Sequence, residues 1–274
     1  MALDARQVMV SHRSLVTALR DLGLTMRSRV IAHVSLARLG REPRHAESVL
    51  GALLETCNTL VMPTFTHQTL VVPADGASTN HLSLSDVPRA EGPPEPFHPD
   101  MPADSVMGEV AEALRRMPVA LRSDHPILSF AGMNAAEALR RQSLEDPWGP
   151  IAWLAENDGD VLLAGMDHTA NVSLHYAEKL AGRKQFLRWA QTAQGVVACA
   201  GCPGCSDGFR VIEPRLAGVA RQLQLGSAML QLIPLRDLIH VAVSWIRQDP
   251  RALLCDRLGC ERCSEVRAAV RLGA

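Results

Sequence analysis

The sequence has no excess of positive charge. Its 28 lysine and arginine residues are balanced by 29 aspartate and glutamate residues, which gives a formal net charge of −1 at pH 7. Proteins that bind nucleic acid or an anionic membrane surface need a clear basic excess. The charge balance therefore argues against both partners and predicts that the protein binds a small molecule.

Long apolar runs are also missing. No stretch approaches the roughly 18 apolar residues of a membrane-spanning helix. The first ten residues contain Asp4 and Arg6 and lack the uninterrupted apolar segment of a signal peptide. We therefore expect a protein of the cytoplasm. Repeats and low-complexity tracts are absent as well, and 274 residues with 47% hydrophobic content suffice for one extended core or two smaller ones.

Strand and helix patterns alternate along the first two thirds of the chain. Short aliphatic runs at residues 29–35, 59–62 and 160–164 are typical of buried strands. Apolar residues at helical spacing predict helices at residues 13–23, 46–54, 105–116, 135–141, 151–156 and 175–180, with Asn134 as an N-cap. The alternation favours a three-layer α/β/α sandwich with a central mixed sheet.

Two regions depart from this alternation. Residues 73–102 are rich in proline and glycine, which predicts a long loop, either a binding segment or a disordered excursion. The last third is richer in cysteine and contains an amphipathic helix at residues 235–247. We divide the chain into an α/β core, residues 1–193, and a cysteine-rich C-terminal lobe, residues 194–274, which completes the fold.

Two polar segments near predicted strands are candidate binding sites. The segment from His33 to Gly40 ends a strand in a turn whose backbone N–H groups could hold a phosphate or carbonyl oxygen, or could only connect two elements. The segment from Arg122 to Ser129 groups donors that could hold phosphates or an amide. A surface turn satisfied by its own side chains is the alternative for the second segment.

A third polar segment, from Asp167 to Glu178, follows a buried strand and begins a helix. His175 and Glu178 stand three positions apart and therefore share a helical face. Histidine changes its protonation state close to the working pH, which suits it to general base catalysis. The alternative is a core histidine that is only hydrogen-bonded.

Seven cysteines are present, and a reducing compartment favours metal binding or free thiols over disulfides. Two C-x-x-C pairs in the C-terminal lobe can place four thiolates around a zinc ion. The preferred ligands are Cys202, Cys205, Cys260 and Cys263, with Cys199 and Cys255 as possible substitutes. Four sulfur ligands leave no open position, so this zinc would be structural. Reduced thiols or a redox pair are the alternative.

In this order, the segments resemble the aminoglycoside 3-N-acetyltransferase family, whose α/β/α sandwich is unrelated to the common N-acetyltransferase fold. The resemblance covers nearly the whole chain. The motifs that carry it are His33-x-Ser35-Leu36 with Gly40, the run from Thr59 to Thr66, Phe97-x-Pro99, Met107-Gly108, Arg122-Ser123-x-His125-Pro126 with Ser129, the run from Gly159 to Gly165, and the run from Asn171 to Glu178.

The resemblance implies an N-acetyltransferase with acetyl-CoA as donor and a primary amine of an aminoglycoside or related small molecule as acceptor. It implies His175 as the catalytic base, for which Glu178, Asp124 and Glu213 are possible carboxylate partners. The implied coenzyme-binding residues are His33, Ser35, Leu36, Arg122, Ser123, His125 and Ser129. The implied acceptor-binding residues are Thr64, Thr66, Asp167 and Asn171, beside Glu178. An acidic pocket would suit a polycationic aminoglycoside.

Three positions differ from the family pattern. Residues 41–46 lack a glycine pair that relatives usually carry, which would make close backbone approach to the coenzyme harder. Val172 replaces a threonine, for which the Ser173 hydroxyl is a possible substitute, and His98 replaces an aspartate.

These differences motivate the second hypothesis, a non-catalytic or repurposed member that binds an acyl carrier or small molecule in a biosynthetic pathway. The histidines and cysteines together prompt the third, a zinc-dependent hydrolase. Resistance and antibiotic biosynthesis are both compatible with an acetyltransferase, as are a monomer and a homodimer.

Overall fold

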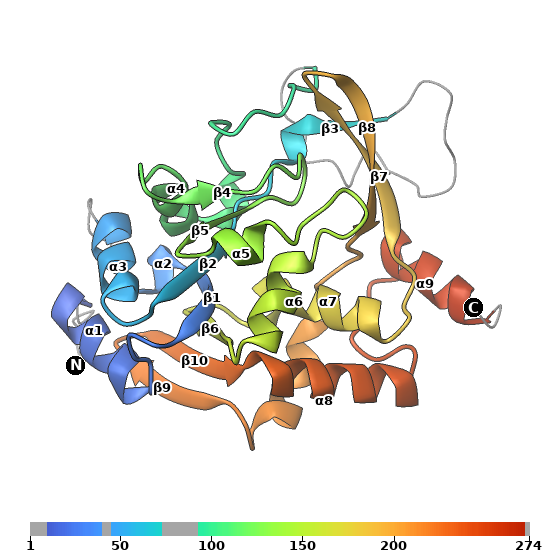
Figure 1. Cartoon of the computed structure of the whole chain (residues 1–274). Coiled ribbons are helices and arrows are strands. Elements are labelled where there is room, and N and C mark those ends of the chain that lie inside the picture. Colours follow the sequence, from blue (N-terminus) through green and yellow to red (C-terminus); the bar gives the residue numbers. More distant parts are fainter. Residues whose placement is uncertain (1–9, 40–44, 73–92, 272–274) are drawn as a thin grey trace, which may run out of the picture.

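The computed structural model describes residues 10–39, 45–72 and 93–271 (Figure 1). Most of the segment at residues 41–46 that differs from the family pattern lies outside these ranges, as do residues 73–92 of the predicted long loop. Within the described ranges, no helix is both long enough and apolar enough to cross a membrane.

A mixed sheet of seven strands forms the centre of the protein. In spatial order the strands are β4 (Leu121–Arg122), β5 (Phe130–Met133), β2 (Thr59–Pro63), β1 (Arg29–Val34), β6 (Asp160–Ala164), β10 (Ala228–Pro234) and β9 (Arg221–Leu225). The three central strands β2, β1 and β6 are parallel, and the pairs toward both edges are antiparallel. All five residues of β2 are buried, as expected of a strand covered on both faces.

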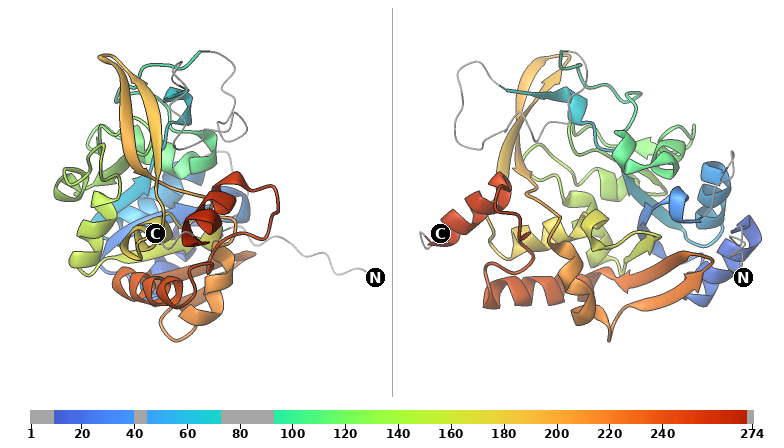
Figure 2. Two further views of the ribbon diagram at one scale, coloured as in Figure 1. Left: turned by 90° about the vertical axis from the view of Figure 1, so that its right-hand side faces the viewer. Right: turned by 180° about the vertical axis from the view of Figure 1, so that it is seen from behind.

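Helices cover both faces of this sheet, which confirms the three-layer α/β/α prediction (Figures 1 and 2). Along β1, Val30 and Ala32 pack in one hydrophobic cluster and Ile31 in the other, because side chains alternate across a strand. The first cluster includes residues of α1 (His12–Asp21), α3 (His45–Leu54) and α4 (Glu109–Arg115). The second includes residues of α5 (Ala136–Leu139), α6 (Gly149–Glu156), α7 (Ser173–Leu180) and α8 (Leu235–Gln248).

A smaller sheet projects from one end of the molecule (Figure 2). It consists of β3 (Leu70–Val71) and the long hairpin of β7 (Phe186–Thr192) and β8 (Gly195–Cys202). The predicted boundary at residue 193 lies in the turn of this hairpin, and β9 and β10 from the predicted C-terminal lobe belong to the central sheet. The last third of the chain is therefore interwoven with the first two thirds.

Two predicted helix boundaries are wrong for reasons of backbone geometry. Gly108 has φ 87°, so the predicted helix at residues 105–116 splits into a 3-10 turn, Ser105–Met107, and α4. Asn134 has φ 51° and is not the N-cap of α5, which is Ala135. The Asn134 amide instead donates to the carbonyl of Asn58 at 2.8 Å.

Candidate active site

His175 lies near the start of α7, on the segment that follows strand β6. The Asn171 side-chain oxygen accepts a hydrogen bond from the Ser173 N–H at 3.2 Å and so satisfies a free donor at the start of the helix. The His175 side chain is 7% exposed. It stacks on Trp148 at 5.7 Å between ring centroids and contacts the tilted ring of Phe209 at 4.7 Å. Two aromatic rings therefore fix its plane.

Glu178 is the carboxylate partner of His175. Its Oε2 lies 2.7 Å from His175 Nδ1, and its Oε1 accepts a 2.7 Å hydrogen bond from Arg183 Nη1. A carboxylate can only accept, so Nδ1 carries the proton of the neutral ring and Nε2 carries the lone pair. The spacing of three residues along a helix thus produces the pair that the sequence predicted, and it leaves Nε2 available to a ligand.

His175 lines a cavity of about 390 Å³ at the carboxyl ends of strands β1 and β2. This volume falls within the range of small-molecule sites, and strand ends are where open α/β sheets bind ligands. The lining residues in or just after those strands are Ala32, His33, Val34, Pro63, Phe65 and His67. A second cavity of about 460 Å³ is lined by Arg122, His125 and Gln142 but by neither His175 nor Glu178. The smaller cavity is therefore the candidate active site.

Charged groups in this cavity come from distant parts of the chain. His67 donates its backbone N–H to Asp104 Oδ2 at 2.9 Å, and the same carboxylate contacts His67 Nδ1. Asp207 and Arg262 also line the cavity, and Asp207 is the one acidic residue among the described lining residues. The described cavity is thus less acidic than the pocket predicted for a polycationic acceptor.

A family model for aminoglycoside 3-N-acetyltransferase matches residues 31–247, which is most of the chain. The chain belongs to the aminoglycoside 3-N-acetyltransferase family. The acetyltransferase is 30% identical over 262 residues to aminoglycoside N(3)-acetyltransferase IX of Micromonospora chalcea, a match that covers 83% of this chain and 90% of that protein. It is 29% identical over 274 residues to acetyltransferase VII of Streptomyces paromomycinus, covering 87% of this chain and 92% of the relative.

The solved structures agree with this assignment. The apoenzyme of aminoglycoside acetyltransferase AAC(3)-IVa superposes with a TM-score of 0.78 at 26% sequence identity, over 97% of this chain and 99% of that chain. The predicted family, fold class and enzyme class are therefore confirmed: the protein is an N-acetyltransferase of the aminoglycoside 3-N-acetyltransferase type.

The predicted acceptor residues of the acetyltransferase lie beside the cavity without lining it. Thr64 and Thr66 are fully buried, and their hydroxyls donate to the carbonyls of Ser129 and Pro126 at 3.2 and 2.7 Å. Pro63, Phe65 and His67 line the cavity in their place. Side chains of an extended segment alternate in direction, so the face that lines this cavity is not the face that carries the two predicted threonines.

Asp167 and Asn171 also have structural partners. Asp167 Oδ1 accepts from the Thr169 N–H at 2.9 Å, and Oδ2 accepts from Arg210 at 3.1 Å. Asn171 Oδ1 accepts from the Ser173 N–H just before α7, whose N-cap is Val172, and Glu178 lies behind His175 and not on the cavity wall. Their neighbours Met166, Thr169, Ala170 and Val172 line the cavity instead.

The position beside His175 therefore has no hydroxyl that faces the cavity. Val172 lines it, whereas Ser173 is fully buried and is not among the lining residues. The Ser173 side chain does not replace the threonine that relatives usually carry at position 172.

Of the predicted coenzyme-binding residues, His33 lines the cavity. Ser35 and Leu36 follow it at the turn that opens α2 (Leu36–Leu39), where the Ser35 N–H donates to the Ala164 carbonyl at 2.9 Å. The turn after β1 therefore lies against the end of β6, the strand that leads to the segment of His175.

The remaining predicted coenzyme residues form a hydrogen-bonded framework. Arg122 donates to Ser129 Oγ at 3.1 Å and to the Thr64 carbonyl at 2.8 Å. Burial lowers its pKa to about 10, so the guanidinium stays charged at neutral pH. Ser123 Oγ accepts from the Phe130 N–H at 2.9 Å, and His125 Nδ1 accepts from the N–H groups of Ile127 and Leu128. These contacts fix the loop after β4 and leave few of its donors for a ligand.

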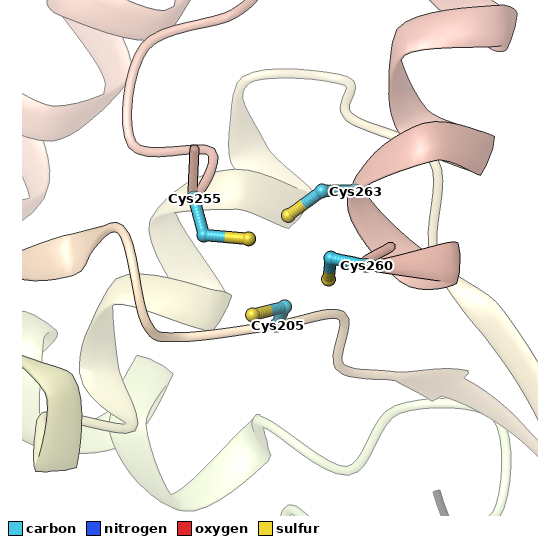
Figure 3. Close-up of side chains that lie close together, drawn as sticks. All are labelled: Cys205, Cys255, Cys260 and Cys263. Atoms are coloured by element: carbon cyan, nitrogen blue, oxygen red, sulfur yellow. The ribbon is translucent and has the colours of Figure 1, made fainter. Parts of the chain in front are cut away.

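Four cysteines meet in the C-terminal part of the acetyltransferase (Figure 3). The sulfur atoms of Cys205, Cys255, Cys260 and Cys263 all lie within 4.8 Å of one another, and all four residues are buried. They come from the loop after β8, the loop after α8 and the start of α9 (Glu261–Arg271). Hydrogen bonding from Cys263 lowers the pKa of Cys205 to about 5, which favours the thiolate that binds metals.

The fourth member is Cys255, and the preference for Cys202 was wrong. Cys202 ends strand β8 and packs with Cys199 in the main hydrophobic core, where its Sγ contacts the Cys199 carbonyl at 3.4 Å. The Pro203-Gly204 turn then carries Cys205 away from that core. Because Gly204, Ser206, Asp207 and Arg262 line the cavity, the four-cysteine cluster supports one of its walls.

Several residues of the site escaped the sequence analysis. They are His67, Trp148, Phe209, Arg183 and Arg262, and each reaches the site through tertiary packing. Two of them had a sequence signal: His67 directly follows the Thr59 to Thr66 motif, and Arg262 lies between Cys260 and Cys263 of a C-x-x-C pair.

Buried histidines should make the folded state sensitive to acid. Burial lowers the pKa of His125 to about 4, and burial together with His168 lowers that of His33 to about 3. Between the ordinary value near 6.5 and these values, the unfolded chain binds the proton and the folded chain does not, so stability falls as the pH falls. We expect each histidine to cost about 2 kcal/mol of unfolding free energy between pH 7 and pH 5.

Thermal unfolding of wild type and His125→Asn at the two pH values tests this expectation. The asparagine oxygen can accept from the same backbone N–H groups but does not titrate. The variant should lose less stability on acidification than the wild type. An equal loss would show that His125 is not buried in its neutral form.

Proposed function

We propose that this acetyltransferase moves the acetyl group of acetyl-CoA to the N3 amine of an aminoglycoside, with His175 Nε2 as the general base. The observation that carries the proposal is the His175–Glu178 pair at the edge of a ligand-sized cavity at the strand ends. A structure of AAC-IIIb, with the same fold, is described as binary with CoASH. A histidine-to-alanine mutant of AAC(3)-IVa, 25% identical to this chain, has been solved in complex with apramycin.

The reaction follows from this geometry. The acceptor nitrogen attacks the thioester carbonyl carbon, so a C–N bond forms, and the tetrahedral adduct collapses with the C–S electrons leaving on the coenzyme sulfur. The proton that the nitrogen loses passes to His175 Nε2. Glu178 stabilises the resulting imidazolium through its bond to Nδ1. The imidazolium then protonates the departing thiolate, which regenerates the base.

The cavity walls suggest where the two substrates bind. We propose that the donor enters along the turn after β1, where His33 lines the cavity and Ser35 and Leu36 follow. An ammonium group of the acceptor would then lie near Asp207, which also lines the cavity and pairs with Arg257. The aromatic faces of Trp148 and Phe209 hold His175 in place while both substrates bind.

The four-cysteine cluster fits a structural zinc ion. Its members are buried sulfurs from three separate segments, and four sulfurs complete a tetrahedral site without an open position. When bound, zinc would cross-link these segments and would take no part in acetyl transfer. Thiolate ligands need a reducing compartment, so we place the enzyme in the cytoplasm.

The activity is tested with purified protein, acetyl-CoA and a panel of aminoglycosides. Loss of the thioester absorbance is the readout, because it follows consumption of the donor directly. We expect turnover that requires both substrates, and mass spectrometry and NMR should place the new acetyl group on the N3 amine. Silence across the panel with folded protein, or acetylation at another amine, would contradict the proposed acceptor.

A further inference from the structure

Arg183 lies behind the catalytic pair and outside the cavity. Its side chain is 3% exposed and that of Glu178 is 5% exposed, and the 2.7 Å contact between Nη1 and Oε1 is an ion pair. Arg183 is not a lining residue, so it contacts neither substrate in the arrangement proposed above.

The end of helix α7 directs Arg183 back over Glu178. The Arg183 N–H donates to the Glu178 carbonyl at 3.0 Å, and the Gly182 N–H donates to the Lys179 carbonyl at 3.0 Å. This pair of bonds is the Schellman motif, which requires a left-handed residue at the helix end. Gly182 has φ 81° and meets that requirement. The local sequence therefore returns the arginine to the helix face that carries the catalytic pair.

The other end of the guanidinium is fixed to a distant segment. Arg183 Nη2 donates to the carbonyls of Pro250 and Ala252 at 2.9 and 2.6 Å, just after helix α8. A guanidinium holds its donors in a rigid planar fork. Three acceptors around this fork leave Glu178 Oε1 little freedom to rotate, and its Oε2 stays on His175 Nδ1.

Stability alone is a poor explanation for this arrangement. A buried ion pair is often no more stabilising than apolar residues of similar volume, because both charges lose their hydration. A positioning function explains why a charged pair is present behind a catalytic imidazole. We propose, on the basis of the function proposed above, that Arg183 is a positioning residue: it fixes the Glu178 carboxylate, which in turn fixes the proton on Nδ1 and the lone pair on Nε2 of His175.

A double-mutant cycle tests this proposal. Arg183→Met in the otherwise wild-type enzyme should reduce kcat by about tenfold or more and leave both KM values unchanged, an effect within the range for residues of one hydrogen-bond network. In a Glu178→Gln background, Arg183→Met should change kcat little, because the Glu178 carboxylate through which Arg183 acts is already gone. Equal losses in the two backgrounds would overturn the proposal.

Two further variants keep the test valid if Arg183→Met unfolds. Arg183→Lys retains the charge and one donor, so it should recover part of kcat, and its effect can be compared in the wild-type and Glu178→Gln backgrounds. Arg188→Met is the matched control, because Arg188 is also buried but donates to the Leu187 carbonyl and lies over the Phe186 ring. It should leave kcat unchanged.

An NMR measurement separates this inference from the proposed function. The proton on His175 Nδ1, bonded to Glu178, should give a downfield signal that shifts or broadens in the Arg183 variants and not in Arg188→Met. An unchanged signal in Arg183→Lys and Arg183→Met would overturn the inference even if His175 is the base. Failure of the proposed function would instead appear as full activity after His175 is removed.

Discussion

Replacing His175 with alanine should reduce kcat by a factor on the order of 10² to 10⁴, the usual effect of a positioned general base. The amine nitrogen of the acceptor loses a proton during acetyl transfer, and in the variant no base would take up that proton. The rings that pack against His175, Trp148 and Phe209, cannot replace it. Steady-state turnover with saturating acetyl-CoA and aminoglycoside measures the effect. Substrate binding should change less than kcat, because the imidazole forms only a small part of the cavity wall.

A control must separate lost chemistry from lost structure. His175 is buried between two rings, so its removal leaves a void, and thermal unfolding of the variant should accompany the kinetics. His240→Ala is a suitable control, since His240 lies on the exposed side of α8. Equal rates for wild type and His175→Ala, both folded, would remove this histidine from the mechanism.

Replacing Cys255 with serine should remove the bound metal and destabilise the protein strongly. We expect a loss on the order of 5 kcal/mol or more in unfolding free energy, because the binding energy of a structural metal contributes directly to folding. For a chain of this size, such a loss corresponds to a decrease in Tm of roughly 10 to 20 °C. Metal content per chain and thermal unfolding of wild type and variant measure both effects.

Cys202→Ser is the matched control for this prediction. Cys202 is also buried, and it belonged to the ligand set that the sequence favoured, but it lies outside the four-cysteine cluster. The variant should keep its metal. Metal loss in Cys202→Ser with retention in Cys255→Ser would support the ligand set predicted from the sequence, which contains Cys202 in place of Cys255. Folded wild-type protein that contains no metal after purification would contradict the zinc site.

Much of the fold was predictable because it depends on local patterns. The strands β1, β2 and β6 have continuous aliphatic runs, and their positions agree with the predictions within a residue or two. Helix breaks were less predictable. Gly108 interrupts a pattern of apolar residues that is helical on both sides of it, and only its positive φ shows that the chain turns there.

The site was predictable where it depends on neighbours in sequence and unpredictable where it depends on packing. The spacing of His175 and Glu178 placed them on one helical face, but the partner was left open among Glu178, Asp124 and Glu213, and the structure shows the contact with Glu178. The choice of Cys202 over Cys255 failed because spacing in C-x-x-C pairs does not show that the Pro203-Gly204 turn separates Cys202 from Cys205. The position of the Arg183 side chain depends on the helix end at Gly182 and on the carbonyls of Pro250 and Ala252. No local sequence pattern connects these two segments.

The position of β10 has a consequence for folding during synthesis. Strand β6, which leads into the segment of His175, pairs with β1 on one side and with β10 on the other. Residues 228–234 leave the ribosome after residues 160–164, so until then the nascent chain exposes an unpaired aliphatic strand edge, which favours aggregation. Covering this edge during synthesis, as a chaperone does, should therefore raise the yield of folded enzyme.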